Sequence, residues 1–199
     1  MPLIIAADEL KKSFPNYDPA RSEDFHSLSA KLADKWFDAA LKIFPSREVA
    51  IMSGGAASGK TEFLTEYLSD FPGIIFDGTF ARPEGARIKI EKILEAKKTV
   101  KIFGVLPEDL RIAFTAFLHR ERKFSDDHFY RTHAGARRTL LFVAKEWPHI
   151  QIEISESSYD AKKGMVFKKL DFGSHQDKIE FLNQIQYTEE DIIKKVTSL

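Results

Sequence analysis

The feature that most constrains this chain is the short run GGAASGKT at residues 54–61. It follows an apolar run, EVAIMS, that is typical of a strand covered on both faces. It precedes KTEFLTEYLSDF, in which apolar residues recur at helical spacing. The run also fits the pattern G-x-x-x-x-G-K-[ST]. Strand, glycine loop and helix in this order predict a loop whose backbone N–H groups hold an anion at the positive end of a helix.

We therefore expect this loop to bind the phosphates of ATP rather than to serve as a flexible Gly/Ala/Ser connector. Lys60 should reach the β- and γ-phosphates, and the Thr61 hydroxyl should ligate Mg²⁺. The nucleotide-binding residues expected here are Gly54, Gly55, Ala56, Ala57, Ser58, Gly59, Lys60 and Thr61.

Apolar runs and amphipathic segments alternate along the rest of the chain. Strands are expected near 48–53, 73–78, 99–107, 149–155 and 165–172, and helices near 22–43, 60–71, 83–98, 107–122, 134–147, 175–186 and 188–197. This alternation predicts an α/β fold of the P-loop NTPase type, a doubly wound, mostly parallel sheet with helices on both faces. We expect one domain over 1–199, with a helical N-terminal arm at 1–45 and a nucleotide-binding core at 46–199.

The arm carries one clear apolar stripe. Its members recur at steps of three and four and are Phe25, Leu28, Leu32, Trp36, Ala39 and Ile43. A stripe of this kind ordinarily packs on a sheet as core, which is our expectation, with a surface for a protein partner as the alternative.

The second motif is IIFDGT at residues 74–79. Asp77 ends an apolar run, so its carboxylate should emerge at the carboxyl end of a strand, where ligands bind in α/β sheets. There it could organise Mg²⁺ or accept a proton from an attacking hydroxyl. The structural alternative is that Asp77 caps the following turn together with Gly78.

A cluster of basic residues follows in a polar stretch. Arg120, Arg122 and Arg131 lie with further basic residues between 111 and 138. We expect a mobile lid at about 119–138 whose guanidinium groups close on phosphates, with Arg120 and Arg131 acting in catalysis and Arg122 on the nucleotide. His128 and His133 are five residues apart, which is a poor spacing for a shared metal ion, so contacts of the lid or substrate are favoured.

Composition limits the remaining function classes. The chain has 30 Lys plus Arg against 30 Asp plus Glu, so no overall field draws it to nucleic acid or to an anionic membrane. It has no cysteine, which excludes disulfides and thiolate metal sites. The opening MPLIIAADELKK is too short an apolar run for a signal peptide, and no stretch is long enough to span a membrane. A cytoplasmic location is the expectation.

Taken together, GGAASGKT, IIFDGT, VKIFGVLP and the helix running into HRERKFSDDHFYRTH resemble the zeta-toxin family of P-loop kinases. The resemblance covers about residues 49–154. Better-known members phosphorylate UDP-N-acetylglucosamine with ATP and Mg²⁺, and many are held inactive by an antitoxin. The resemblance implies that Asp77 and Thr79 contact the substrate, that Lys60 and Thr61 serve ATP and Mg²⁺, and that the lid arginines grip phosphates.

One spacing departs from that family. Only 15 residues separate Thr61 from Asp77, whereas family members place there an additional segment that carries the proposed catalytic base. Either Asp77 takes the role of base, or the family's substrate site is lost.

The leading function hypothesis is ATP-dependent phosphoryl transfer to a hydroxyl of a small molecule, a sugar nucleotide among the candidates. The alternatives are a nucleotide-dependent switch or NTPase that binds a protein partner, such as an antitoxin, and a polynucleotide kinase. The neutral net charge argues against extended nucleic-acid contact but not against recognition of a terminal hydroxyl.

Overall fold

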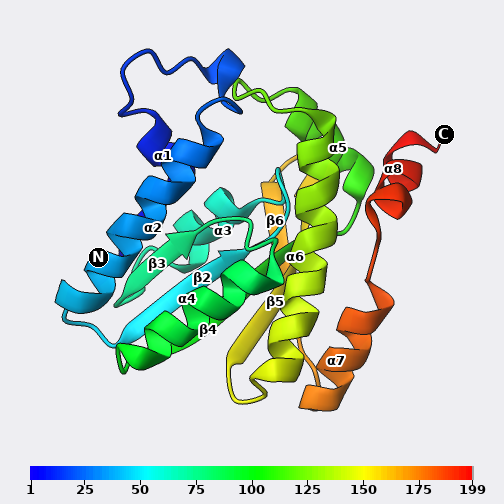
Figure 1. The fold of residues 1–199 in the computed structure, drawn as a ribbon. Helices are drawn as coiled ribbons and strands as arrows, with labels where there is room; N and C mark the ends of the chain where they lie inside the picture. Colours follow the sequence, from blue (N-terminus) through cyan, green and yellow to red (C-terminus); the bar gives the residue numbers. More distant parts are fainter. Residues whose placement is uncertain (199) are drawn as a thin grey trace.

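The computed structural model describes residues 1–198 and contains a six-stranded sheet in the order β1-β3-β2-β4-β5-β6. The strands are β1 (Leu3–Ala6), β2 (Glu48–Ser53), β3 (Ile74–Asp77), β4 (Thr99–Pro107), β5 (Gln151–Asp160) and β6 (Gly164–Leu170). All neighbours are parallel except β6, which pairs antiparallel with β5 through a tight turn. The predicted mostly parallel α/β sheet is confirmed (Figure 1).

Helices cover both faces of this sheet. They are α1 (Ala7–Lys11), α2 (His26–Ile43), α3 (Lys60–Tyr67), α4 (Pro83–Glu95), α5 (Leu110–Leu118), α6 (Asp126–Glu146), α7 (His175–Gln184) and α8 (Glu189–Thr197), with a 3-10 turn at Pro19–Arg21. Residues of α2, α4, α6 and α7 share one core with Val49 and Ile51 of β2. Residues of α3 pack with Ala50 and Met52 on the opposite face. Among helices of residues 1–198, none has the length and apolar character required to cross a membrane.

Strand β2 explains why the glycine loop lies at the centre of the molecule. It pairs with β3 on one side and β4 on the other, and its residues from Val49 to Ser53 are fully buried. Alternate side chains point to opposite faces, so a strand covered on both faces needs a continuous apolar run. The loop that follows therefore starts at the carboxyl edge of the sheet, where α/β folds bind ligands.

The N-terminal segment is more than a helical arm. Leu3–Ala6 form β1, which pairs parallel with β3 and extends the sheet beyond the predicted strands. This strand was not predicted, because a run of four residues is too short to show a periodic pattern. Residues 1–45 thus contribute part of the sheet itself.

Helix α2 faces the sheet with a different stripe from the one expected. The residues that enter the core are Ala33, Phe37, Ala40 and Leu41. Leu28, Trp36 and Ile43 are instead 56%, 53% and 80% exposed. Ala33, Phe37, Ala40 and Leu41 recur at helical spacing, so the sequence carries a second apolar stripe on α2, and this is the stripe that packs in the core. The expectation that the bulky stripe packs on the sheet is wrong.

Candidate active site

The glycine loop connects β2 directly to α3, as predicted. Gly54 and Gly59 have φ values of 154° and 85°, conformations that glycine adopts without steric cost. A Cβ atom on Gly54 would lie 2.4 Å from the carbonyl oxygen of Val105, and one on Gly55 would lie 2.3 Å from the His133 ring. The close packing around the loop therefore requires both adjacent glycines.

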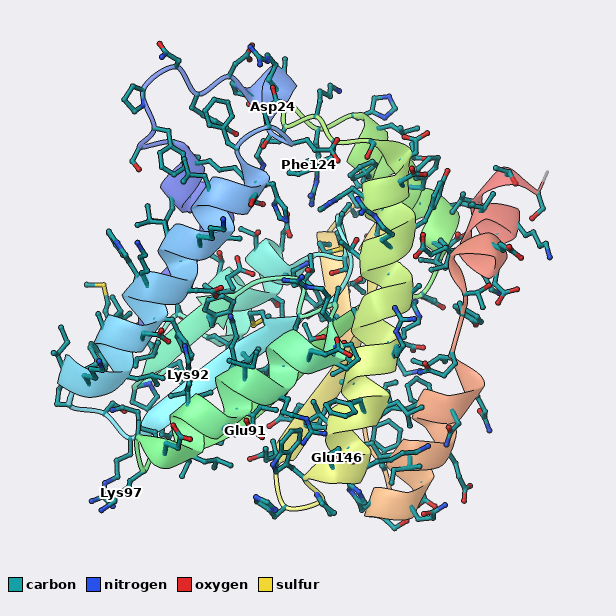
Figure 2. All side chains as sticks on the ribbon, in the orientation of Figure 1. Asp24, Glu91, Lys92, Lys97, Phe124 and Glu146 are labelled. Atoms are coloured by element: carbon teal, nitrogen blue, oxygen red, sulfur yellow. The ribbon has the colours of Figure 1, made fainter. Side chains whose placement is uncertain are left out.

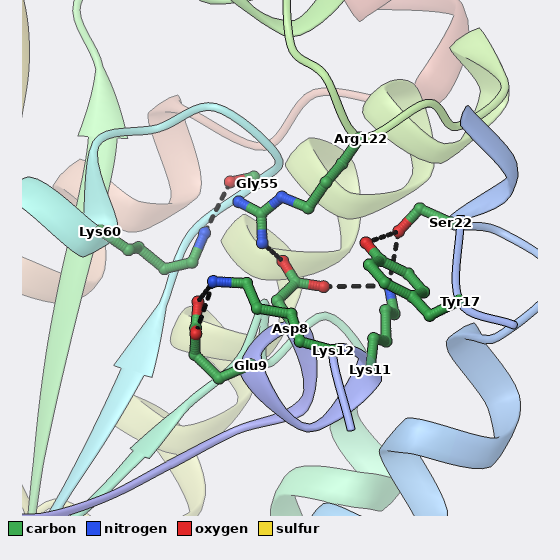
Figure 3. Close-up of polar contacts among 9 residues, drawn as sticks. All are labelled: Asp8, Glu9, Lys11, Lys12, Tyr17, Ser22, Gly55, Lys60 and Arg122. Atoms are coloured by element: carbon green, nitrogen blue, oxygen red, sulfur yellow. Dashed lines mark hydrogen bonds and ion pairs between the residues drawn. The ribbon is translucent and has the colours of Figure 1, made fainter. Parts of the chain in front are cut away.

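The Lys60 side chain turns back into this loop. Its Nζ donates to the carbonyl oxygen of Gly54 at 2.9 Å. It also donates to the carbonyl oxygen of Gly55 at 2.8 Å (Figure 3). Burial lowers the pKa of Lys60 to about 8, and the charge of Asp77 acts in the opposite direction. A desolvated ammonium group attracts an anion more strongly than a hydrated one does, because water screens it less.

Helix α6 supports the loop from the protein interior. The Ala56 N–H donates to Thr132 Oγ1 at 3.1 Å, and His133 Nε2 lies 2.8 Å from the Ala56 carbonyl oxygen. Burial, followed by the charge of Arg137, lowers the pKa of His133 well below its ordinary value. The neutral ring therefore donates its Nε2–H to that carbonyl. Thr132 and His133 fix the backbone of the loop.

Two carboxylates lie at the ends of neighbouring parallel strands. Asp77 is the last residue of β3 and is in register with Ala6, the last residue of β1, and Asp8 follows two residues later. Both carboxylates line one cavity with Lys60, Thr61 and the predicted substrate residue Thr79. The backbone also joins these motifs, since the Gly54 N–H donates to the Thr79 carbonyl at 3.1 Å.

The two carboxylates have different environments. Burial raises the pKa of Asp77, partly offset by Lys60, and no side chain of residues 1–198 donates a hydrogen bond to it. Burial by itself would raise the pKa of Asp8 as well, but the nearby charges of Lys11 and Arg122 have a larger combined effect, so the pKa of Asp8 is lowered. Asp8 is bound to these two cations at 2.9 Å each (Figure 3). Asp77 is the carboxylate that remains available for chemistry.

Arg120 and Arg122 line the same cavity, as predicted, and they come from the connection between α5 and α6. This connection is tied to the N-terminal segment. Arg122 pairs with Asp8, the Lys123 N–H donates to the Pro19 carbonyl at 2.9 Å, and Glu23 accepts from the backbone N–H of Ser125 at 2.9 Å. Figure 2 shows Phe124 where the two segments meet, and its ring contacts Lys11.

The predicted lid at 119–138 is therefore not one loop. From Asp126 onward it is the first part of α6, and Phe129, Thr132, His133 and Arg137 are buried there. The polar residues of KFSDDHFYRTH indicated a loop, although those on one side of the helix face the protein interior. Only the short connection before Asp126 faces the cavity as a loop.

Of the residues predicted to act in catalysis, Arg131 lies elsewhere. It is exposed on α6, its Nε donates to the Asp127 carbonyl oxygen at 3.3 Å, and it does not line the cavity. His128 does line the cavity, where it stacks on Phe124, and burial and His26 lower its pKa to about 4. Within residues 1–198 no three His, Cys, Asp or Glu side chains gather in a way that could hold a metal ion.

The donor chemistry nevertheless fits Mg²⁺ bound together with phosphates. Thr61 offers a hydroxyl and Asp77 a carboxylate on one cavity. Mg²⁺ usually takes one or two protein oxygen ligands and completes its shell with phosphate oxygens and water. A cluster of three protein carboxylates is therefore not required.

Several residues of this cavity were not predicted from the sequence. Asp8, His26, Phe117 and Phe124 line it beside the predicted residues. A signal for Asp8 was present, because LIIAAD repeats the order of IIFD, an apolar run that ends in an acidic residue. The cavity measures about 100 Å³, which accommodates a few small groups rather than a whole nucleotide.

Solved structures with a similar fold are crystal structures of the AvrRxo1-ORF1:AvrRxo1-ORF2 complex. The native one has a TM-score of 0.56 at 14% identity, covering 87% of this chain and 79% of that chain. A structure with sulphate ions has a TM-score of 0.56 at 13% identity, covering 86% of this chain and 76% of that chain. A structure with ATP has a TM-score of 0.57 at 13% identity, covering 88% of this chain and 74% of that chain. At these identities the likeness shows the fold alone. The sequence matches no protein-family model and no curated protein.

Proposed function

We propose that this chain transfers the terminal phosphoryl group of ATP to a hydroxyl group of a small molecule. The observation that carries the proposal is the cavity where the buried Lys60 ammonium, the available Asp77 carboxylate and Arg120 meet. The similar fold of a complex crystallised with ATP supports a nucleotide ligand. The resemblance to zeta toxins favours a sugar nucleotide as acceptor.

In this reaction the acceptor oxygen forms a bond to the γ-phosphorus while the bond from that phosphorus to the ADP oxygen breaks. The acceptor hydroxyl proton passes to the Asp77 carboxylate, whose raised pKa suits a proton acceptor better than an ordinary aspartate. Lys60 and Arg120 neutralise the phosphoryl oxygens, and the backbone N–H groups of the loop other than those of Gly54, Ala56 and Ser58, which bond within the protein, orient the phosphates.

Mg²⁺ would be held by the Thr61 hydroxyl, and by Asp77 in the alternative where this carboxylate organises the metal rather than accepting the proton. When bound, the ion neutralises charge on the β- and γ-phosphates.

Separate measurements of binding and turnover test these roles. Lys60→Ala should weaken ATP binding by about tenfold or more, as expected for the loss of a charged hydrogen-bond donor. Asp77→Asn should keep ATP affinity within about threefold and lower turnover by about 100-fold or more. Calorimetry gives the affinities and mass spectrometry the phosphorylated product. Undiminished turnover in Asp77→Asn would remove Asp77 from the mechanism.

A second function, nucleotide-dependent binding of a protein partner, is favoured by the outward stripe of α2. Leu28, Trp36 and Ile43 form an exposed apolar row on one helix, and rows of this kind mark protein contacts. The similar structures are complexes of two proteins, which supports a partner for this chain. An antitoxin is the partner that the zeta-toxin resemblance suggests.

Site-specific cross-linking tests that surface. A photoreactive residue at position 28 should capture one recurring protein in cells, and Trp36→Glu should abolish the capture. Ile88 on α4 is 54% exposed, close to the 56% of Leu28, so position 88 is the matched control. Equal capture from positions 28 and 88 would contradict the proposal that the exposed apolar row of α2 binds a protein partner.

A further inference from the structure

A second and larger cavity borders the glycine loop. It has a volume of about 1360 Å³ and is lined by the ends of β4 and β5, by α5 and by the segment from α7 to α8. Ala57 of the loop lines this cavity, whereas Ala56 and Ser58 line the first one. The proposed phosphoryl transfer does not use Arg137, Tyr187 or Lys195, which lie on this second cavity.

Arg137 of α6 is the unusual residue on this cavity. It is 3% exposed, and its Nε has no hydrogen-bond partner within residues 1–198. Its Nη1 donates to the His133 carbonyl oxygen at 3.1 Å. Its guanidinium carbon lies 5.3 Å from the centre of the Tyr187 ring. No carboxylate of the described residues forms an ion pair with Arg137. Burial lowers the pKa of Arg137 only to about 10, so the guanidinium stays charged at neutral pH.

Such a placement is costly for the folded chain on its own. Moving a cation out of water is compensated only by an opposite charge or by complete hydrogen bonding. The His133 carbonyl oxygen, a longer contact of 3.4 Å from Nη1 to His133 Nδ1 and one aromatic face satisfy Arg137 in part, and Nε has no hydrogen-bond partner among the described residues. Three acidic residues line the cavity wall: Asp109 pairs with Arg111 at 3.2 Å, Glu156 pairs with Lys168 at 3.8 Å, and Glu108 is exposed and forms no ion pair with Arg137.

The surroundings of Arg137 indicate the chemistry of a ligand. Lys195 also lines the cavity, and its Nζ lies 4.4 Å from the same Tyr187 ring. Two cations on one aromatic residue suit a group with two negative charges, and a planar guanidinium suits phosphate oxygens. Phe181 and Ile185 add apolar wall beside them, which suits the body of an organic molecule.

We propose that the second cavity binds a phosphate-bearing small molecule, with Arg137 and Lys195 on the phosphate and the body of the molecule against Tyr187. The phosphate group can belong to the nucleotide that occupies the glycine loop or to a separate metabolite. The two sources share this chemistry and are distinguished by competition. The site does not depend on Lys60.

The direct test observes the Arg137 side chain. In the Lys60→Ala protein, labelled with ¹⁵N-arginine, the Nε–Hε resonance of Arg137 is followed by NMR during titration with inorganic phosphate and then with AMP. We expect a saturable shift of this resonance, and no comparable shift for Arg138, which is exposed one residue further along α6. Addition of ATP to the unaltered protein then reports the source. Displacement of the probe assigns the phosphate to the nucleotide, and its retention assigns a separate ligand.

A stability measurement gives independent evidence. Arg137→Met keeps the length of the side chain and removes the buried charge, so the ligand-free protein should melt at an equal or higher temperature. The same variant should bind the phosphate probe about tenfold more weakly or worse. Arg138→Met is the matched control and should leave probe binding unchanged.

Two results would overturn the proposal. One is an Arg137 resonance that stays in place with both phosphate and AMP in the Lys60→Ala protein. The other is a destabilised Arg137→Met protein that still binds the probe as the parent does, which would make Arg137 a structural residue. If Arg137→Met fails to fold, Arg137→Lys and the NMR titration decide the question.

Discussion

At the scale of single residues, burial changes the acid–base properties of Lys60 and Asp77 in opposite directions. It lowers the pKa of the ammonium group and raises that of the carboxylate. Each group alone therefore holds its charge less firmly than in water. Both groups line one cavity, so an anion placed there stabilises the protonated form of Lys60, and a nearby hydroxyl can give its proton to Asp77.

The pKa of Lys60 predicts how phosphate binding depends on pH. A lysine in the unfolded chain has a pKa of 10.5, and burial lowers that of Lys60 to about 8. The buried charge therefore costs folding free energy below pH 8, and this cost is released as the pH rises from about 8 toward 10.5. ATP needs the protonated form, so its affinity should fall above pH 8 and its binding near pH 8 should take up protons.

Calorimetry in buffers of different ionisation enthalpy measures this proton uptake. Lys60→Arg provides the control, because arginine stays charged throughout this range. Its affinity for ATP should change little between pH 7 and pH 9.5. The same decline in the parent protein and in Lys60→Arg would show that another group controls the pH dependence.

Gly55 is the residue at which the packing behind the loop can be tested. A Cβ atom there would lie 2.3 Å from the His133 ring, and overpacking of this kind costs about 1–3 kcal/mol. We expect Gly55→Ala to lower the free energy of unfolding by that amount and to weaken ATP binding. Gly85→Ala is the matched control, since the nearest atom lies 4.0 Å from its Cβ position in α4, and alanine favours a helix.

Urea denaturation of the two variants gives the comparison. Equal stability of Gly55→Ala and Gly85→Ala would mean that α6 does not hold the loop closely.

At the scale of elements, the connection between α5 and α6 is fastened to the N-terminal segment rather than free to swing. Arg122 pairs with Asp8, and the backbone N–H groups of Lys123 and Ser125 donate to Pro19 and Glu23. The segments lie side by side although about 100 residues separate them in the chain (Figure 1). The N-terminal segment thereby positions the arginines of the cavity.

Hydrogen exchange can measure this attachment. Asp8→Asn and Glu23→Gln together should speed the exchange of the Ser125 amide by about tenfold, because a neutral side-chain amide replaces the carboxylate that accepts its hydrogen bond and the ion pair of Arg122 is lost. The Asp24→Asn variant is the control, since Asp24 pairs with Arg21 at the surface and does not touch the connection. Unchanged exchange in the double variant would show that the connection is ordered by other contacts.

The same elements show what the sequence could predict. The glycine loop, Asp77 and the parallel sheet follow local patterns, because the strand, turn and helix signals around the loop lie within residues 48–71 and Asp77 directly ends an apolar run. β1 and Asp8 depend on pairing with β3, some 70 residues away, and a four-residue run carries no period. The support of the loop by Thr132 and His133 could not be predicted, because these residues stand in a run of mostly polar residues. Only the folded helix α6 shows that they lie on its buried face.

At the scale of the whole molecule, the fold brings the ends of three parallel strands to one edge. β2 supplies the glycine loop, β3 supplies Asp77, and β1 leads into Asp8. The connection between α5 and α6 closes the cavity with Arg120 and Arg122. The arrangement places the partly buried Lys60 ammonium and the Asp77 carboxylate on one cavity, and the proposed phosphoryl transfer requires a cation and a carboxylate placed in this way.

The measurement that tests this account most directly is a search for the phosphorylated product. The protein is incubated with ATP, Mg²⁺ and a pooled extract of metabolites and sugar nucleotides, with Lys60→Ala and Asp77→Asn alongside, and mass spectrometry detects any species that gains a phosphate. The account predicts a product that appears with the parent protein and is absent or at least about 100-fold slower with either variant. ATP binding without any species gaining mass, or a product made equally well by both variants, would contradict it.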